Sequence, residues 1–392
     1  MPYRLARRTK NAKTSIFTEL MEYLSDPSFI SFSGGFPAAH LFPVEKLKEA
    51  ANRVFEDEGQ DALQYASTWG YEPLRAWIAK RYQTRFEMDI DPNDILITTG
   101  SQQALDLIGK VFLDSNDHIV VEYPSYLGAI QAFAQYETTF HEVRLHDEGL
   151  DLHQLRTFLK TYHPKLLYMV PNFQNPTGIS YSAANRQAIV EMIQPYDVIL
   201  VEDDPYGELR YLGQFEKPFK ALAPDRTILL GSFSKIISPG IRVGWMVIPK
   251  ALREPLFNAK EASDLHTSNL DQRIVYQYLK HNPLDTHIKT NVDYYAKQRE
   301  TMLNAMQKYF PSNVTIAKSE GGMFFWVSLP SHLSAIDIFH KAVTLKVVFV
   351  PGDPFYVSKE RMNTFRLNYT SASPQQIEEG IQRLGSLLKS LV

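Results

Sequence analysis

The 392-residue sequence contains no cysteine. This absence excludes disulfides, thiolate nucleophiles and cysteine metal sites, and it leads us to expect a protein of the reducing cytoplasm. Long apolar runs are missing too, since none approaches the ~20 residues of a membrane-spanning helix and no apolar core of a secretory signal begins the chain. Charge of one sign is also scarce: 41 basic residues face 44 acidic ones, for a net charge of -3. Neither nucleic acid nor an anionic membrane is therefore expected as a partner.

What the sequence does contain is an alternation of strand and helix patterns. Its 44% hydrophobic and 22% charged residues are ordinary for a globular protein, and its length allows two domains. Between residues 93 and 245, short apolar runs of strand length alternate with helical stretches. This alternation predicts an α/β fold with a mostly parallel sheet and helices on both of its faces.

The stretch TILLGSFSKIISPGIRVG, residues 227–244, carries Lys235 where a buried strand meets an irregular turn. Desolvation favours the neutral form of an amine, which is the form that reacts with a carbonyl cofactor to give a Schiff base. Ser232, Ser234 and Arg242 supply donors for a phosphate group beside that amine. A surface lysine that happens to follow a strand is the alternative.

Other polar residues also follow predicted strands. Gly100 and Ser101 begin a helix directly after an apolar run, which is the geometry of a phosphate or carboxylate site. Tyr126 and Asn175 each stand just beyond a strand, and the carboxyl ends of parallel strands share one edge of a sheet. We therefore expect these side chains to converge on one cleft, although strand-to-helix turns that bind nothing have the same pattern.

Three consecutive carboxylates, at residues 202–204, end another strand. They would repel one another unless something positive lies nearby. A metal ion is one candidate and the protonated ring nitrogen of a bound cofactor is the other. Earlier in the chain, Gly34 and Gly35 stand before an X-Pro step, which indicates either a loop close to a ligand or a simple turn.

The C-terminal region offers a group for a substrate carboxylate. Arg366 lies in the short strand TFRLNY, and its planar guanidinium can bind a carboxylate through two hydrogen bonds. An arginine in an ordinary salt bridge is the alternative. Ser373 and Pro374 then begin a predicted helix with one apolar stripe, formed by Ile377, Ile381, Leu384 and Leu388.

Taken together, the strings PNFQNPTG, EDDPYGELRY and GSFSKIISPGIRVGW resemble those of the pyridoxal-phosphate aminotransferases of fold type I. The similarity is greatest to the aminoadipate and kynurenine aminotransferases and to the aminotransferase-like half of the MocR regulators, and it spans residues 31–392. It implies a large domain, residues 36–265, with a mostly parallel sheet of seven-stranded type. It also implies a smaller α/β domain, residues 266–392, joined by an arm and substrate lid from residues 1–35.

The resemblance further implies the catalytic roles. Lys235 would bind pyridoxal phosphate as a Schiff base and, once displaced by a substrate, carry a proton between the substrate α-carbon and the cofactor. Asp203 would pair with the pyridine nitrogen and keep it protonated, so that the ring withdraws electrons. Asn175 and Tyr206 would hydrogen-bond the phenolic oxygen of the ring, and no metal would be needed.

The remaining contacts follow from the same resemblance. Tyr126 would stack on the ring, and Tyr71 would reach in from the second subunit of a homodimer. Arg366 would take the substrate carboxylate, beside Asn175, Gly35 and Phe17. The phosphate would be held by Ser101, Gln102, Ser232, Ser234 and Arg242.

The predicted reaction moves the amino group of an L-amino acid to a 2-oxo acid, 2-oxoglutarate, by a ping-pong mechanism. The donor would be aromatic or hydrophobic, or similar to 2-aminoadipate. Phe17 stands where aminoadipate-type members carry an arginine, which favours an apolar side-chain pocket.

Two alternatives stay open. One is a β-lyase of the same fold, and the other is a ligand sensor without turnover. The sensor is less expected, because the roughly thirty residues before Gly34 are too few for a winged-helix DNA-binding domain.

Overall fold

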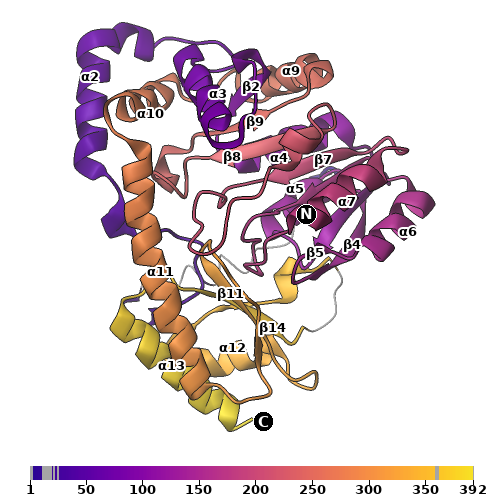
Figure 1. Ribbon diagram of the computed structural model, residues 1–392, viewed down its shortest axis with the longest axis vertical. Coiled ribbons are helices and arrows are strands. Elements are labelled where there is room, and N and C mark those ends of the chain that lie inside the picture. Colours follow the sequence, from indigo (N-terminus) through magenta and orange to yellow (C-terminus); the bar gives the residue numbers. More distant parts are fainter. Residues whose placement is uncertain (1–2, 11–19, 21–22, 24–25, 358–361, 392) are drawn as a thin grey trace.

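The computed structural model describes residues 3–10, 20, 23, 26–357 and 362–391 (Figure 1). Within these residues an eight-stranded sheet forms the upper part of the molecule in Figure 1, and a four-stranded sheet lies below it. The long helix α11 (Leu284–Tyr309) runs down one side, from beside α10 (Asn269–His281) to beside α13 (Pro374–Lys389).

The large sheet has the strand order β2-β9-β8-β7-β6-β3-β4-β5. Strands β8, β7, β6, β3 and β4 are mutually parallel, whereas β9 runs antiparallel to both β8 and β2, and β5 runs antiparallel to β4. The predicted mostly parallel sheet is confirmed, with the two-residue β5 as an eighth strand at one edge. The bounds are β2 (Ile95–Thr98), β3 (His118–Tyr123), β4 (Thr139–His146), β5 (Gly149–Leu150), β6 (Leu166–Met169), β7 (Ile199–Asp203), β8 (Thr227–Ser232) and β9 (Gly244–Val247).

Side chains of the parallel strands alternate between two apolar layers. Val120, Leu167 and Leu200 belong to one layer, together with residues of α6 (Leu152–Tyr162) and α7 (Ala183–Ile193). Their strand neighbours Val121, Tyr168 and Val201 belong to the other layer, with residues of α4 (Ser101–Phe112) and α5 (Leu127–Ala134). Because successive side chains of a strand point to opposite faces, an uninterrupted apolar run fits a sheet covered on both faces.

Local sequence explains where several helices begin. α3 (Glu72–Phe86) has Pro73 in its first turn, and α4 begins at Ser101 directly after Gly100. α13 begins with a capping box between Ser373 and Gln376, and the predicted stripe of this helix is buried. The remaining α-helices of the described residues are α2 (Val44–Ala62), α8 (Phe219–Leu222), α9 (Arg253–Asp264) and α12 (Ala335–Thr344).

The smaller sheet is antiparallel and has the order β10-β11-β14-β13. Beside it, the N-terminal strand β1 (Ile30–Ser31) pairs in parallel with β12 (Val347–Val348), which joins the two ends of the chain. Where one domain ends and the next begins stays a prediction. The bounds are β10 (Thr315–Ile316), β11 (Phe324–Ser328), β13 (Val350–Pro351) and β14 (Thr364–Asn368).

Much of the N-terminal arm implied over residues 1–35 lies outside the described residues, which between residues 11 and 25 include only positions 20 and 23. Leu20 is buried, and the Tyr23 ring lies 5.1 Å from the ring of Phe29. Among the helices of the described residues, none has the length and apolar character that crossing a membrane requires.

Gly385 allows α13 to pack closely against α11, and a substitution at this position can test the packing. A Cβ at this position would lie 2.6 Å from the carbonyl oxygen of Tyr309, a backbone atom that cannot rotate away. We expect Gly385→Ala to lower the free energy of unfolding by about 1–3 kcal/mol through overpacking, measured by urea denaturation.

Gly59→Ala in α2 is the matched control, because a Cβ there would meet no atom within 4 Å. This variant should be unchanged or more stable by up to about 1 kcal/mol, since alanine is the better helix former. Equal stability of the two variants would contradict the close packing of α11 on α13.

Candidate active site

A cleft of about 350 Å³ opens where the parallel strands β3, β6, β7 and β8 end. Side chains from both sheets and from the segment after β1 meet in it, as the polar residues that follow the strands predict. The sequence-predicted residues that line the cleft are Gly35, Ser101, Gln102, Tyr126, Asn175, Asp203, Tyr206, Ser232, Ser234, Lys235, Arg242 and Arg366.

Lys235 places its amine inside the cleft, in the turn after β8. Its Nζ donates a hydrogen bond of 2.8 Å to the carbonyl oxygen of Gly35. Burial, together with the positive charges of Arg366 and Arg242, lowers the pKa of this amine to about 8. A large share of the amine is therefore neutral, and nucleophilic, in mildly alkaline solution.

The N-terminus of α4 forms one wall of an anion-binding cup. Gly100 precedes the helix with a φ of 74°, a conformation that favours glycine, and a Cβ there would lie 2.4 Å from Arg242 Nη2. Arg242 also donates to the carbonyl oxygen of Thr99, at 3.3 Å. A guanidinium and the free N–H groups of a helix start thus face the same point, which favours a phosphate.

Two serines complete the cup from the turn after β8. Ser232 Oγ donates to Ser234 Oγ at 2.9 Å and accepts from the Ser234 backbone N–H at 3.1 Å. On the opposite side, Gln102 Nε2 donates to the carbonyl oxygen of Gly128 at 2.8 Å, close to Tyr126. All five residues predicted to hold the phosphate therefore line this cleft.

The three consecutive carboxylates at the end of β7 are separated by their surroundings. Glu202 accepts hydrogen bonds of 2.9 Å from the backbone N–H groups of Phe219 and Lys220, away from the cleft. Asp204 accepts from Asn172 Nδ2, also at 2.9 Å. Only the middle carboxylate, Asp203, lines the cleft. Among the described residues, no cluster of three or more side chains could hold a metal ion.

Asp203 has one free oxygen. Its Oδ2 accepts a hydrogen bond of 2.8 Å from the Tyr168 hydroxyl, whereas Oδ1 is buried and has no hydrogen-bond partner among the described residues. Burial raises the pKa of this carboxyl to about 7, although the hydrogen bond from Tyr168 opposes the rise. An N–H group beside Oδ1 would satisfy it, so the site fits the protonated ring nitrogen of the cofactor implied by the resemblance.

Arg366 links the two sheets across the cleft. Its Nη1 donates to Asn175 Oδ1 and its Nη2 to the carbonyl oxygen of Ser33, both at 2.7 Å. Asn175 Nδ2 in turn donates to the Tyr206 hydroxyl at 3.3 Å. The side chain of Arg366 is only 1% exposed, stands 4.2 Å from the Phe324 ring centroid, and pairs with no carboxylate of the described residues. A buried guanidinium without a counter-ion favours the binding of a carboxylate.

One predicted residue of the described part of the chain stands apart from this cleft. Tyr71 does not line it: its hydroxyl donates to Glu58 Oε2 at 3.2 Å, and the Arg273 guanidinium lies 4.5 Å from its ring centroid. A role for Tyr71 in the cleft of a second subunit stays a prediction. Phe17 lies outside the described residues, so the expected apolar contact with a substrate also stays a prediction.

Sequence reasoning missed a buried glutamine that fixes two site loops. Gln174 Nε2 donates to Glu122 Oε2 at 2.9 Å and to the Pro124 carbonyl at 2.8 Å, and its Oε1 accepts from the Thr177 backbone N–H at 2.9 Å. The loops that carry Tyr126 and Asn175 are thereby joined. The only sequence signal was the position of this polar residue between two asparagines.

Other lining residues were also missed. Phe36, Leu127, Gly128 and Gln131 border the cleft. Each lies within a few residues of a predicted position, Gly35 or Tyr126. Their sequence neighbourhood could have identified them, but not the direction of their side chains.

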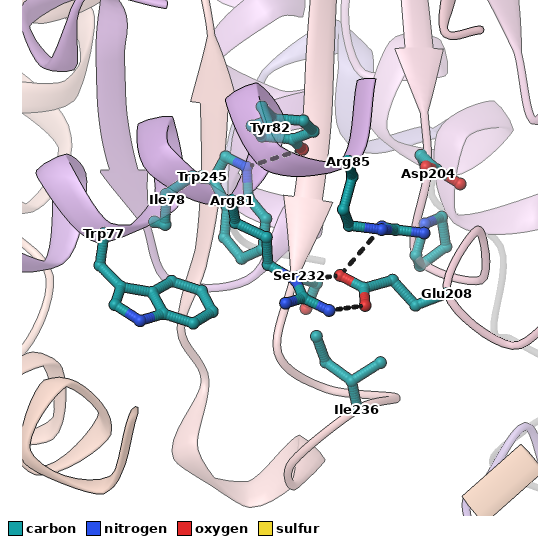
Figure 2. Close-up of a pocket in the computed structure, with 11 residues that line it drawn as sticks. Trp77, Ile78, Arg81, Tyr82, Arg85, Asp204, Glu208, Ser232, Ile236 and Trp245 are labelled. Carbon is teal, nitrogen blue, oxygen red and sulfur yellow. Dashed lines mark hydrogen bonds and ion pairs between the residues drawn. The ribbon is translucent and has the colours of Figure 1, made fainter. Parts of the chain in front are cut away.

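A smaller cavity, of about 30 Å³, lies on the other side of Ser232 and Pro205, which line both spaces. Figure 2 shows Arg81 and Arg85 reaching from α3 toward Glu208, which pairs with both of them. A space of this size holds about one water molecule. The paired charges brace the loop that follows Asp203, and they leave no room for a larger ligand.

Comparison with protein families gives a match over most of the chain. The model of "Aminotransferase class I and II" matches residues 29–384. An aromatic-amino-acid aminotransferase of Thermococcus litoralis is 41% identical over 96% of this chain and 92% of its own length. A 2-aminoadipate transaminase of Thermus thermophilus is 42% identical over 97% of this chain and 95% of its own.

A solved structure agrees with this match. The kynurenine aminotransferase of Pyrococcus horikoshii, crystallised with PMP, superimposes with a TM-score of 0.95. It is 39% identical in sequence, and the alignment covers 99% of this chain and 97% of the other. Similarity at this level extends over both sheets and not over the large sheet alone.

The depressed pKa of Lys235 gives a prediction for the protein stripped of any cofactor. Because the amine is charged below its pKa of about 8 and neutral above it, the rate of reaction with an aldehyde should rise through a midpoint near pH 8. The measurement is imine formation trapped by borohydride and located by peptide mapping. Lys235→Ala serves as the control that lacks the labelled peptide, and a midpoint above pH 9.5 would contradict burial of the amine.

Proposed function

Because the chain belongs to the class I and II aminotransferases and is a pyridoxal-phosphate-dependent enzyme, we propose that it transfers the amino group of an aromatic or other large apolar L-amino acid to 2-oxoglutarate. The observation that carries this proposal is the set of unpaired buried groups in the cleft. Asp203 Oδ1 and Arg366 Nε have no hydrogen-bond partner among the described residues. Asp203 Oδ1 can accept a hydrogen bond from a ring N–H. Arg366 Nε belongs to the guanidinium that we propose to bind the substrate carboxylate.

The apolar donor is supported by the walls of the cleft. Phe36 and Leu127 line it, and the cations that line it within the described residues are Lys235, Arg242 and Arg366. Each of these three has a proposed partner in the cofactor or in the α-carboxylate of the substrate. An acidic side chain would therefore find no unassigned cation in the described part of the site, and burying it there would be costly.

The acceptor 2-oxoglutarate must share the same cleft in a ping-pong reaction. Gln131 is exposed at the rim and offers an amide N–H for a second carboxylate. A carboxylate at the rim keeps part of its hydration, so this arrangement does not require a buried cation. A 2-aminoadipate donor is the competing possibility, suggested by one of the relatives.

Pyridoxal phosphate, when bound, supplies an aldehyde for the amino group and a ring that withdraws electrons from the substrate α-carbon. The residues present fit this group. Asp203 Oδ1 would hold the proton of the ring nitrogen, and Tyr126 would stack on the ring. Asn175 and Tyr206 would hydrogen-bond its phenolic oxygen. The phosphate would be held by Ser101, Gln102, Ser232, Ser234 and Arg242.

Lys235 and Arg366 then act on the substrate. Arg366 holds the α-carboxylate through its planar fork, which fixes the orientation of the α-carbon. Lys235 Nζ, which is neutral above about pH 8, would take the proton from that carbon. The carbonyl oxygen of Gly35 accepts a hydrogen bond from the same amine and keeps it inside the cleft.

We propose a homodimer as the working unit, with Tyr71 completing the phosphate site of the other subunit. The described contacts support this role, because Glu58 and Arg273 hold the Tyr71 ring outside the cleft of its own chain. The cytoplasmic location expected from the sequence stays a prediction.

The proposed function predicts a cycle in visible absorbance. With cofactor bound at Lys235, the yellow band should fade on addition of phenylalanine or tyrosine and return on addition of 2-oxoglutarate. Stopped-flow absorbance with single amino acids gives the donor preference. Lys235→Ala should show no cycle at all.

Three results would contradict parts of this proposal. A band that fades with 2-aminoadipate but not with phenylalanine, tyrosine, leucine or methionine would reject the apolar donor. A band that shifts and never returns would favour the lyase or the sensor. If another 2-oxo acid restores the yellow band and 2-oxoglutarate does not, 2-oxoglutarate is rejected as the acceptor.

Arg366 is expected to recognise the substrate by its carboxylate. Wild type should therefore prefer phenylalanine over phenethylamine, which lacks this group, and Arg366→Ala should lose about 10²–10³-fold of that preference in kcat/KM. Arg366→Lys keeps the charge but not the planar fork, and should lie between the two. An unchanged preference in Arg366→Ala would place the carboxylate elsewhere.

A further inference from the structure

Tyr168 lies beneath the cleft, and its hydroxyl has a single hydrogen-bond partner among the described residues. The side chain is fully buried in the layer between the large sheet and helices α4 and α5, where its ring packs edge-on against Phe133 at 5.9 Å. Its hydroxyl donates to Asp203 Oδ2 at 2.8 Å. Tyr168 does not itself line the cleft.

Strand register explains why this tyrosine reaches Asp203. Tyr168 on β6 stands opposite Val201 on the parallel strand β7. Asp203 lies two residues beyond Val201, hence on the same face of the sheet, because side chains alternate along a strand. A side chain as long as tyrosine spans the diagonal between neighbouring strands, so the Tyr168 hydroxyl on β6 reaches the Asp203 carboxylate on β7.

The packing of the apolar layer does not by itself require the hydroxyl of Tyr168. Phenylalanine would fill the same apolar layer, whereas a buried hydroxyl is costly unless it is hydrogen-bonded. Asp203, for its part, has no other side-chain donor among the described residues, since its Oδ1 is unpartnered. The two groups therefore satisfy each other, and the free oxygen of the carboxylate is the one left for the cleft.

We propose that Tyr168 is a positioning residue for the cofactor: its phenol holds Asp203 Oδ2 and thereby presents Oδ1, as a carboxylate, to the ring nitrogen. The inference rests on the proposed pairing of Asp203 with that nitrogen. Burial and the neighbouring Asp204 both oppose ionisation of Asp203, and the hydrogen bond from the phenol counters part of their combined effect. Other ionisable groups that interact with Asp203 are Glu122, Tyr126 and Tyr206.

The experiment compares two cofactors on the cofactor-stripped full chain. One is pyridoxal phosphate, and the other is deazapyridoxal phosphate, which has carbon in place of the ring nitrogen. Dissociation constants are measured by absorbance titration for wild type and for Tyr168→Phe. Because a hydrogen bond to a charged group is lost, we expect Tyr168→Phe to bind pyridoxal phosphate about tenfold more weakly. Binding of the deaza analogue should change less than about twofold.

Tyr181→Phe is the matched control. Tyr181 is also fully buried, and its hydroxyl also donates at 2.8 Å to a buried carboxylate, that of Glu122. It should leave the ratio of the two dissociation constants unchanged, although it removes a hydrogen bond of the same kind. A thermal melt of each stripped variant shows that both chains fold.

The possible outcomes separate the two claims. If wild type binds both cofactors equally well, the proposed pairing of Asp203 with the ring nitrogen fails, and this inference with it. If wild type prefers pyridoxal phosphate and Tyr168→Phe keeps the full preference, the inference alone is overturned. An equal loss for both cofactors in Tyr168→Phe would reduce Tyr168 to a packing residue and overturn the inference as well.

Discussion

Asp203 and Arg366 are buried and Lys235 is half-buried around one cleft, and removing such groups from water costs several kcal/mol each unless they are paired. The protein pairs each of them in part. A carbonyl oxygen receives the Lys235 amine, Tyr168 supports one carboxylate oxygen of Asp203, and Asn175 with Ser33 holds two nitrogens of Arg366. The atoms that remain without a partner, such as Asp203 Oδ1 and Arg366 Nε, define the shape and charge of the molecules that the cleft accepts. Chemistry at this site is therefore a consequence of incomplete pairing within a well-packed interior.

The large sheet and the position of the cleft could be predicted from the sequence because both depend on local patterns. Apolar runs such as 228–230 are long enough for a strand and too short for a buried helix. A polar residue that ends such a run lies at the edge of a parallel sheet whatever the details of packing. For this reason Ser101, Asp203 and Lys235 converge although more than a hundred residues separate the first from the others.

The partners of these residues could not be predicted in the same way, since they depend on register and on side-chain direction. Nothing in LLYM distinguishes Tyr168 from its neighbours until β6 is aligned with β7. The pairing of Arg81 and Arg85 with Glu208 joins a helix to a loop far along the chain. Tyr71 shows a further limit, because its proposed place is in another subunit. A single sequence specifies the reacting groups more plainly than the groups that hold them.

The hydrogen bond between Arg366 and Ser33 joins residues 333 positions apart, and the pairing of β1 with β12 spans a similar stretch of the chain. Contacts of such long sequence separation form late, because the entropy of closing the loop must be overcome first. On the ribosome the N-terminal strand emerges early and has to wait for its partner until nearly the whole chain has been synthesised. A nascent chain can therefore complete the large sheet and still lack a closed cleft. A chain that ends before Arg366 would lack the guanidinium, and it would also lack most of β14, the strand that pairs with both β11 and β13.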